Sequence, residues 1–488
     1  MPKIILLSLI SVALLSQLNA EDTITLKPIA ITSTAIATDE LKSTDAVEVY
    51  TQEDIEKAHS RNIYEFLNSQ TSLTTVSAFG NPFTQLIDIH GYGTSNGNQN
   101  IVITIDGRKL NNIDNSVQLL SSISPNSIAK IEIIKSSGIV IGGDGANAGV
   151  INITTKNNND KNIAFYMGNY GLIDGSFYIG HSDKQVSISA SGEAQRNDGT
   201  RYIDSNGNKD ESSFSTGTFN LAYRPIETLE LRLGASLTNI DVRYASFLTQ
   251  AQYDENPAQK SNSFFPSTHQ KFTTKSIGGG TTYDINDALS IKIDANHEYK
   301  TSDFVPSFGI ATYNYNSLKT SIDYMSEDMA LSVGYDGFYG KRKQSGKQTS
   351  KNNNALFAMV QLYFGNNTFK AGYRYDRVSY EHQETGKDLK DASYLYGVEL
   401  GYNYTLDKQS SLFANYSHGY QAANIDMFFS TTFAPPLFIP STDFNEFIQP
   451  MISDNYTIGY NNINAKNKLK VSAYYIDLID EIYLYKAL

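Results

Sequence analysis

The sequence predicts an all-β transmembrane barrel, antiparallel throughout, that is preceded by a small α+β domain. From Lys161 onward, segments of about ten residues alternate apolar and polar side chains, as strands do when one face meets lipid and the other faces the lumen. Tight turns alternate with long polar loops between these segments, which places the two kinds of connection at opposite ends of a barrel. The region before Lys161 instead mixes short helical patterns with β-branched runs.

The composition agrees with a sheet-rich protein of more than one unit. The 488 residues include 33 Tyr, 24 Phe and 34 Gly, and this length exceeds that of a usual single domain. The absence of Cys excludes a disulfide framework and thiolate metal sites. A net charge of −12 argues against a nucleic-acid partner, which would require a basic surface.

Residues 1–20 have the pattern of a secretory signal peptide. Lys3 precedes the apolar run Ile4–Leu18, and Ala20 offers a small residue for cleavage. A single membrane anchor is the alternative, but the run is shorter than the roughly 20 residues that a helical span requires. Residues 21–46 then form an extended, β-branched segment and linker.

The small domain is expected over residues 47–156. Val47–Tyr50 has the composition of a strand, and Thr51–Asp54 has the spacing of a capping box, which predicts a short helix. Ser60 is expected to cap a second helix, because the apolar residues after it recur at helical spacing. Both helices should pack against a small sheet.

The end of this domain is a strand, a bend and a second strand. Two β-branched runs, Ile131–Ile134 and Val150–Thr155, flank a glycine-rich bend that leaves no room for a helix. Gly143–Ala148 fits the dinucleotide pattern G-x-G-x-x-A, but that motif requires a helix directly afterwards, and a strand follows instead. We therefore expect no nucleotide site.

These residues, with "DIHGYG" at Asp88–Gly93 and "NIVITIDGRKL" at Asn100–Leu110, resemble the plug domain of TonB-dependent outer-membrane receptors. The resemblance covers Val47–Lys156 and implies a plug that fills the barrel lumen and meets ligand with its outer loops. Ordinary solvated turns are the alternative for each loop. The candidate ligand contacts are Phe79, Asn81, Phe83, Asn96, Asn98, Asn112 and Asp114.

The segment before the plug resembles the TonB box of this family. In that family a flexible strand pairs with the edge of a sheet in an energy-transducing protein of the inner membrane. Thr23–Leu26 is the second choice for the position of the TonB box, and the alternative is that the whole segment is a disordered linker. The predicted box consists of Pro28, Ile29, Ala30, Ile31, Thr32 and Ser33.

The barrel is expected over residues 157–488, with about 15 strands. Plugged transporters use about 22 strands, so we expect the barrel to be incomplete and the chain to be truncated at its C-terminus; a smaller barrel is the alternative. Tyr residues at strand ends should form interfacial girdles. Tight turns are predicted at Ser182–Asp183, Pro225–Ile226, Ser326–Glu327, Gly365–Asn366 and Asp407–Lys408. Long loops are predicted near 195–210, 246–267, 341–351, 381–391 and 422–452.

Two features depart from what the resemblance implies. Relatives carry Arg where this chain has His90 and Lys135, so any clamp between those Arg residues and carboxylates of the barrel wall should be weaker here. His418 lies in "YSHGYQAAN", which is similar to a segment of haem-transporting relatives, but the further His and Asn-Pro-Asn-Leu element of those relatives are missing. Haem is therefore not expected, nor is any other cofactor.

The resemblance implies a TonB-dependent receptor in the outer membrane of a Gram-negative bacterium, and not an enzyme. Its ligand is expected to be a ferric siderophore, with cobalamin, nickel chelates and oligosaccharides as alternatives. The expected partners are a TonB-type protein, outer-membrane lipid and a small metal chelate, and we expect a monomer. The alternative functions are an energy-independent surface protein, such as an adhesin or passive channel, and a non-functional remnant of a receptor.

Overall fold

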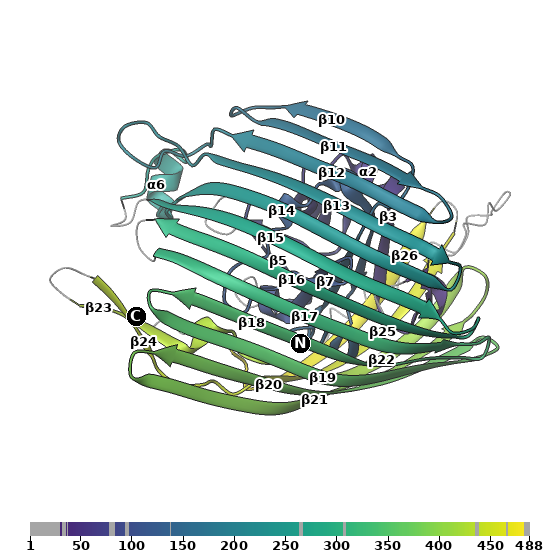
Figure 1. Cartoon of the computed structure of the whole chain (residues 1–488). Coiled ribbons are helices and arrows are strands. Elements are labelled where there is room, and N and C mark those ends of the chain that lie inside the picture. The colour runs from purple at the N-terminus through teal and green to yellow at the C-terminus, as the bar shows by residue number, and fades with distance from the viewer. Residues whose placement is uncertain are drawn as a thin grey trace, which may run out of the picture.

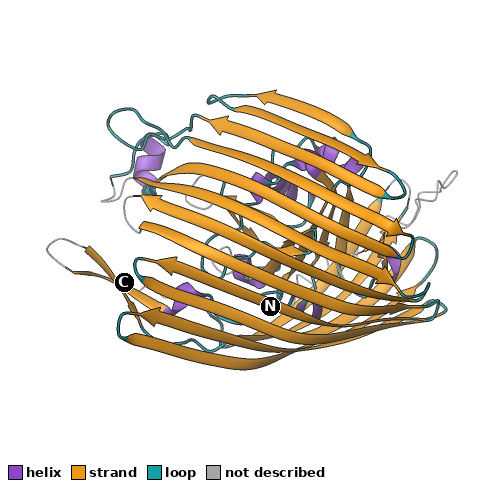
Figure 2. Ribbon diagram, viewed as in Figure 1, coloured by secondary structure: helices purple, strands orange, loops and turns teal. Residues whose placement is uncertain are grey.

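A large curved sheet encloses a small mixed domain in the computed structural model (Figure 1). The structure describes residues 30–31, 36, 38–77, 83–92, 97–136, 138–262, 267–305, 309–434, 439–464 and 467–482. We call residues 38–156 the inner domain and the 15-stranded sheet the barrel sheet. Figure 2 shows that the short helices lie inside the space that the barrel sheet encloses or at its ends, whereas the sheet itself is built of strands alone.

The inner domain is built on a five-stranded sheet in the order β3-β8-β9-β6-β7, in which β6 and β9 run parallel. The strands of this sheet are β3 (Val47–Thr51), β6 (Ile101–Ile105), β7 (Arg108–Lys109), β8 (Ile128–Ile134) and β9 (Gly149–Thr155). The other strands are β1 (Ala30–Ile31), β2 (Thr38–Asp39), β4 (Thr74–Ser77) and β5 (Gln85–Asp88). The helices are η1 (Glu40–Lys42), α2 (Gln52–Ala58), α3 (Ile63–Gln70), α4 (Gly97–Asn100), η3 (Leu120–Ser122), η4 (Pro125–Ser127) and α5 (Ile139–Gly142).

The helix starts confirm one cap and correct another. Thr51 and Asp54 form the predicted capping box at the start of α2. The cap of α3 is Asn62, whose side chain accepts a hydrogen bond from the Glu65 amide, so the choice of Ser60 was wrong. Buried Ile63, Phe66 and Leu67 then pack on the sheet. Asn accepts this bond as readily as Ser, and the sequence pattern does not separate two such candidates two residues apart.

The glycine-rich bend contains a helical turn that the sequence analysis excluded. α5 occupies only four residues between β8 and β9 and ends at Gly143, whose φ of 68° suits glycine. One helical turn fits where a longer helix would not. A strand, β9, follows the G-x-G-x-x-A pattern as predicted, so no helix N-terminus faces those glycines.

The barrel sheet has 15 antiparallel strands, the number counted from the sequence, and its edges among the described residues are β10 and β26. They are β10 (Lys161–Met167), β11 (Ile173–Ser182), β12 (Val186–Asn197), β13 (Ser212–Ile226), β14 (Leu229–Ala245), β15 (Ser267–Asp284), β16 (Leu289–Val305) and β17 (Gly309–Met325). The chain continues through β18 (Met329–Gln344), β19 (Lys347–Phe364), β20 (Asn367–Glu384), β21 (Lys387–Thr405), β22 (Ser410–Gln421), β25 (Met451–Ile463) and β26 (Lys468–Ile479).

Four of the five predicted tight turns join consecutive strands, whereas Pro225–Ile226 lies at the end of β13 and the turn follows at residues 227–228; two of the predicted long loops are also wrong. β18 and β19 meet directly at Ser345 and Gly346, and β20 and β21 leave only residues 385–386 between them. Ser345 and Gly346 both have positive φ, 51° and 77°, as in the two-residue turns that suit hairpins. Residues 341–351 read KRKQSGKQTSK and contain no apolar side chain, so the alternation that marks strands in the sequence is lost there.

The long connections project from one end of the barrel sheet, which we call the long-loop end; the opposite end is the short-turn end. α6 (Gln250–Glu255) lies between β14 and β15, and the loop between β22 and β25 holds η5 (Ile425–Phe428) and the hairpin β23 (Phe429–Ala434) and β24 (Ile439–Phe444). Figure 1 shows both at the left. No helix among the described residues is long and apolar enough to cross a membrane.

Candidate functional site

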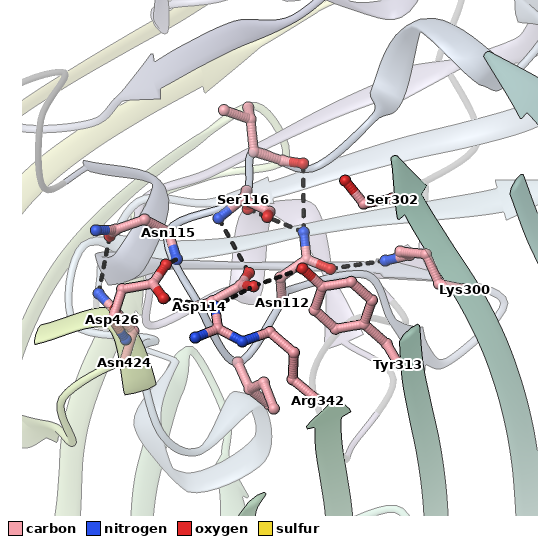
Figure 3. Close-up of polar contacts among 12 residues, drawn as sticks. Asn112, Asp114, Asn115, Ser116, Lys300, Ser302, Tyr313, Arg342, Asn424 and Asp426 are labelled. Carbon is pink, nitrogen blue, oxygen red and sulfur yellow. Dashed lines mark hydrogen bonds and ion pairs between the residues drawn. The ribbon is translucent and has the colours of Figure 1, made fainter. Parts of the chain in front are cut away.

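The loop at residues 111–117 of the inner domain reaches the long-loop end and is held by side-chain to backbone hydrogen bonds. Asn111 donates to the Ile101 carbonyl at 2.7 Å and accepts from the Ile103 amide at 2.9 Å, which fixes the start of the loop on β6. Asn112 donates to the Ser116 carbonyl at 2.9 Å, closing the loop on itself. These bonds present Asp114 to the barrel wall (Figure 3).

Asp114 is buried between two side chains of the barrel wall. Its Oδ2 accepts a hydrogen bond from the Tyr313 hydroxyl at 2.8 Å and lies 3.0 Å from a guanidinium nitrogen of Arg342. Burial alone would raise the pKa of the Asp114 carboxyl, but Arg342 and the Tyr313 hydroxyl bring that pKa below its usual range. Asp114 is therefore a charged anchor between the inner domain and β17 and β18.

Arg342 also joins the inner domain to the loop between β22 and β25. The same guanidinium nitrogen binds Asp426, and Asp426 accepts a hydrogen bond from the Asn115 amide at 3.0 Å. The Ile425 amide donates to the Ile113 carbonyl at 2.8 Å. Burial, followed by the charge of Asp114, raises the pKa of the Asp426 carboxyl. One cation thus holds two carboxylates, one on the inner domain and one on an outer loop.

A cavity of about 710 Å³, the outer cavity, lies beside this cluster at the long-loop end. Asp114, Arg342 and Asp426 are part of its wall. Its charged lining also includes Lys347, so two acids face two bases. The aromatic lining is Tyr244, Phe272, Phe304, Tyr313 and Phe429. Such a lining suits a bulky molecule that carries both flat apolar parts and polar groups.

The predicted ligand contacts fall in four groups. Asp114 lines the outer cavity, and Asn112 lies behind it, accepting a hydrogen bond from Lys300 of β16 at 2.6 Å. Phe83 is buried against Phe214 of β13 and faces the barrel wall instead of the cavity. Asn98 lies in α4. Phe79, Asn81 and Asn96 lie outside the described residues.

The predicted TonB box is described only in part. Ala30–Ile31 forms β1 and pairs antiparallel with β2. The other four residues, Pro28, Ile29, Thr32 and Ser33, lie outside the described residues. The segment that follows is held firmly on the barrel wall at the short-turn end: Lys370 of β20 donates to Asp45 at 2.7 Å and to Glu399 of β21 at 3.0 Å. All three side chains are buried.

The sites of the missing Arg residues do not hold the inner domain on the barrel through charge. Lys135 binds Glu48 at 2.7 Å, within the inner domain. His90 stacks on Tyr474 of β26, with ring centroids 4.0 Å apart. Carboxylates of the inner domain instead meet cations of the barrel, as Asp144 meets Lys351 at 2.6 Å. Among the described residues, no cluster of His, Asp and Glu could hold a metal ion.

The sequence analysis missed Tyr313, Arg342 and Asp426. Tyr313 and Arg342 lie on strands, where the period of two predicts only that they face the lumen. Asp426 lies in a loop far along the chain from Asp114. Asp114 was predicted only as a ligand contact, and its burial, which calls for a cation, is seen only in the packed structure.

Comparison with known families finds two matches that together cover most of the chain. The family described as "TonB dependent receptor-like, beta-barrel" matches residues 139–487, and the "TonB-dependent Receptor Plug Domain" matches residues 39–150. No curated protein matches the chain.

Solved structures share the fold at low sequence identity. The ferric citrate transporter FecA, in its unliganded form, is 14% identical with a TM-score of 0.74, over 93% of this chain and 73% of its own. The ferric yersiniabactin uptake receptor FyuA from Yersinia pestis is 13% identical with a TM-score of 0.69, over 89% and 72%. The copper transporter OprC is 16% identical with a TM-score of 0.68, over 88% and 71%.

Proposed function

Because the chain belongs to the TonB-dependent receptor family, we propose that it binds a ferric siderophore in the outer cavity and imports it with energy from a TonB-type protein. Members of this family are receptors and transporters of Gram-negative outer membranes, not enzymes, and they interact with TonB. In this proposal the barrel sheet lies in the outer membrane, the long-loop end faces outward, and the inner domain is the plug.

The outer cavity is the observation that carries the proposal. It lies at the long-loop end and is lined by the inner domain, the barrel wall and an outer loop. A ligand there would touch Asp114 of the plug and Asp426 of the loop at once, so its arrival could be sensed by the plug. The aromatic lining favours a chelate with flat apolar parts, and the balanced charges do not require a strongly charged one.

The related structures support an iron chelate without selecting one. They include receptors for yersiniabactin, alcaligin and enterobactin and a transporter of ferric citrate, but also a copper transporter. At 11–16% identity they share the fold with this chain. The chemical class of cargo therefore has to be measured.

We propose that energy reaches the plug through Pro28–Ser33. This segment precedes Asp45, which Lys370 holds at the short-turn end while also pairing with Glu399. A pull on the segment would load this buried contact before it reached β3. Separating buried opposite charges costs free energy, so thermal motion alone rarely breaks this contact.

The test is uptake in a receptor-deficient Gram-negative host that expresses the full chain. Radioactive iron is supplied as its yersiniabactin, citrate, alcaligin or enterobactin complex, and radioactive copper is supplied separately. Each probe is measured with the intact chain, with Pro28–Ser33 deleted, and with Thr23–Leu26 deleted as the matched control.

We expect the intact chain to accumulate at least one iron complex, the Pro28–Ser33 deletion to bind it without accumulating it, and the Thr23–Leu26 deletion to behave as the intact chain. Accumulation that survives both deletions would mean energy-independent entry and would contradict the proposal. If only copper is taken up, the cargo is copper and not a ferric siderophore.

A further inference from the structure

A second cavity, the inner cavity, lies between the inner domain and the wall of β12–β16. Its volume is about 350 Å³, roughly half that of the outer cavity. The inner domain contributes Asp106 and Arg108 and the end of β9. The barrel contributes small or hydroxyl-bearing side chains: Ser191, Thr216, Thr218, Ser236, Thr238, Thr274, Ser276 and Gly278. The same wall also carries apolar Leu221 and Leu233 and charged Arg232 and Asp294, so it offers hydrogen-bonding and charged groups beside apolar ones.

The two cavities lie one below the other along the same strands. On β15, Phe272 lines the outer cavity and Thr274 and Ser276 line the inner one. On β16, Ser302 lines the outer cavity and Asn296 the inner one. Successive inward-facing residues of one strand therefore lead from the outer site toward the short-turn end.

An apolar partition separates the cavities. Leu119 lines both of them. It packs on a buried cluster that joins Phe83 of the inner domain to Phe214 and Phe272 of the wall. Below it, Arg108 of β7 pairs with Glu298 of β16, and that carboxylate also lies 3.2 Å from Lys300. Phe83 and Leu119 belong to loops of the inner domain, so movement of that domain would open the partition.

The opposite wall holds the inner domain by many more charged contacts. Asp114 meets Arg342 of β18 at 3.0 Å, Asp144 meets Lys351 of β19 at 2.6 Å, and Asp45 meets Lys370 of β20 at 2.7 Å. On β21, Glu399 accepts a hydrogen bond from the Val140 amide at 2.9 Å. Across the inner cavity, the described residues show one plug-to-wall ion pair, Arg108 with Glu298, and one hydrogen bond from a charged group, Lys300 to Asn112 at 2.6 Å.

Apolar packing follows the same division. Ile139 and Val140 of α5 are fully buried in a large cluster with side chains of β17–β22. The apolar contact on the wall of β13–β15 is the smaller partition cluster, with water-sized space directly below it. The plug is therefore fixed on one side and loosely packed on the other.

Building on the proposed function, we propose that the inner cavity is a transit site for the cargo and that the plug yields along β12–β16 while α5 stays attached to β19–β21. Cargo leaves the outer cavity when Phe83 and Leu119 move off Phe272. It then passes along the hydroxyl-bearing wall, where the Arg108–Glu298 pair is the last charged contact to part.

The absence of Cys in this chain allows two tethers to be compared. Thr155→Cys with Asn220→Cys bridges the inner cavity, because the Thr155 hydroxyl and the Asn220 amide nitrogen are 3.3 Å apart. Ile139→Cys with Gly397→Cys bridges the fixed side, where a Cβ on residue 397 would lie 3.5 Å from the Ile139 Cβ. Each pair is closed as a direct disulfide by mild oxidation and opened again by a reductant.

Uptake and surface binding of the radioactive iron complexes named above are measured before closure, after closure and after reduction. We expect closure of the 155–220 tether to lower uptake at least about tenfold, to leave surface binding unchanged, and to be reversed by reduction. Closure of the 139–397 tether should change uptake less than about twofold. Equal effects of the two tethers, or the reverse order, would overturn the inference.

A second measurement needs no cargo and so separates this inference from the proposed function. In native-state hydrogen exchange of the purified full chain, amides at residues 105–110 and 119–124 should lose protection before those at residues 139–147. If residues 139–147 exchange first, the plug opens on the other side and the inference is wrong. If no complex is taken up but exchange has the expected order, the proposed function and the transit of cargo fail, and the inference that the plug yields along β12–β16 stands.

Discussion

Lys370→Met should release the segment around Asp45, at the start of the plug, from the barrel wall. Lys370 and Asp45 have side-chain exposures of 2% and 4%, and Glu399 has 5%, so both carboxylates would remain buried without a cation. Removing one partner of a buried ion pair costs about 3–5 kcal/mol. At 1.4 kcal/mol for each factor of ten, this is roughly a hundred- to several-thousandfold change in the equilibrium for local opening.

Native-state hydrogen exchange at residues 43–51 measures this opening. Lys390→Met is the matched control, because Lys390 pairs with Glu381 on the surface, where solvent screens the pair and its loss should change exchange little. Lys370→Met combined with Asp45→Asn and Glu399→Gln should regain much of the protection, since no buried charge is left unpaired. Exchange of Lys370→Met within about threefold of the wild type would refute the reasoning.

Two further predictions concern the outer cavity and the plug. Arg342→Gln leaves Asp114 buried without its cation and breaks the link to Asp426, so surface binding of the iron complex that is taken up should weaken at least about tenfold. Arg377→Gln, at an exposed position on β20, should not change it. Burial and, less strongly, Lys135 lower the pKa of His90 from 6.5 to about 4, so unfolding takes up a proton between these values. The free energy of unfolding should be greatest above about pH 6.5 and fall toward pH 4. His90→Asn tolerates the φ of 61° and should show a smaller fall with pH in thermal melts. An equal fall in the variant and the wild type would contradict this assignment.

The strands of the barrel could be predicted because lipid and lumen impose a period of two on every strand within the membrane. That signal ends where the strands leave the lipid, which is why β18–β21 continue through residues expected to be loops. β21 reaches 19 residues, where about ten were expected. The turn at Ser345–Gly346 closes such a polar hairpin.

Local chemistry explains the successes and failures in the plug. The Thr51 capping box lies within four residues and could be found by spacing alone. α5 is stabilised by packing of Ile139 and Val140 on β19–β22, which no local pattern reports. Asp114 could be proposed from its loop, but the identity of Arg342 depends on the order of strands around the barrel, and so it required the structure.

The most direct test of the account is accumulation of the radioactive iron complexes in two otherwise identical hosts that express this chain, one with and one without the inner-membrane TonB protein. We predict equal surface binding in both hosts and accumulation only in the host with TonB, because the plug closes the lumen until its buried contacts are pulled apart. Equal accumulation in both hosts would contradict the account, since cargo would then cross without energy.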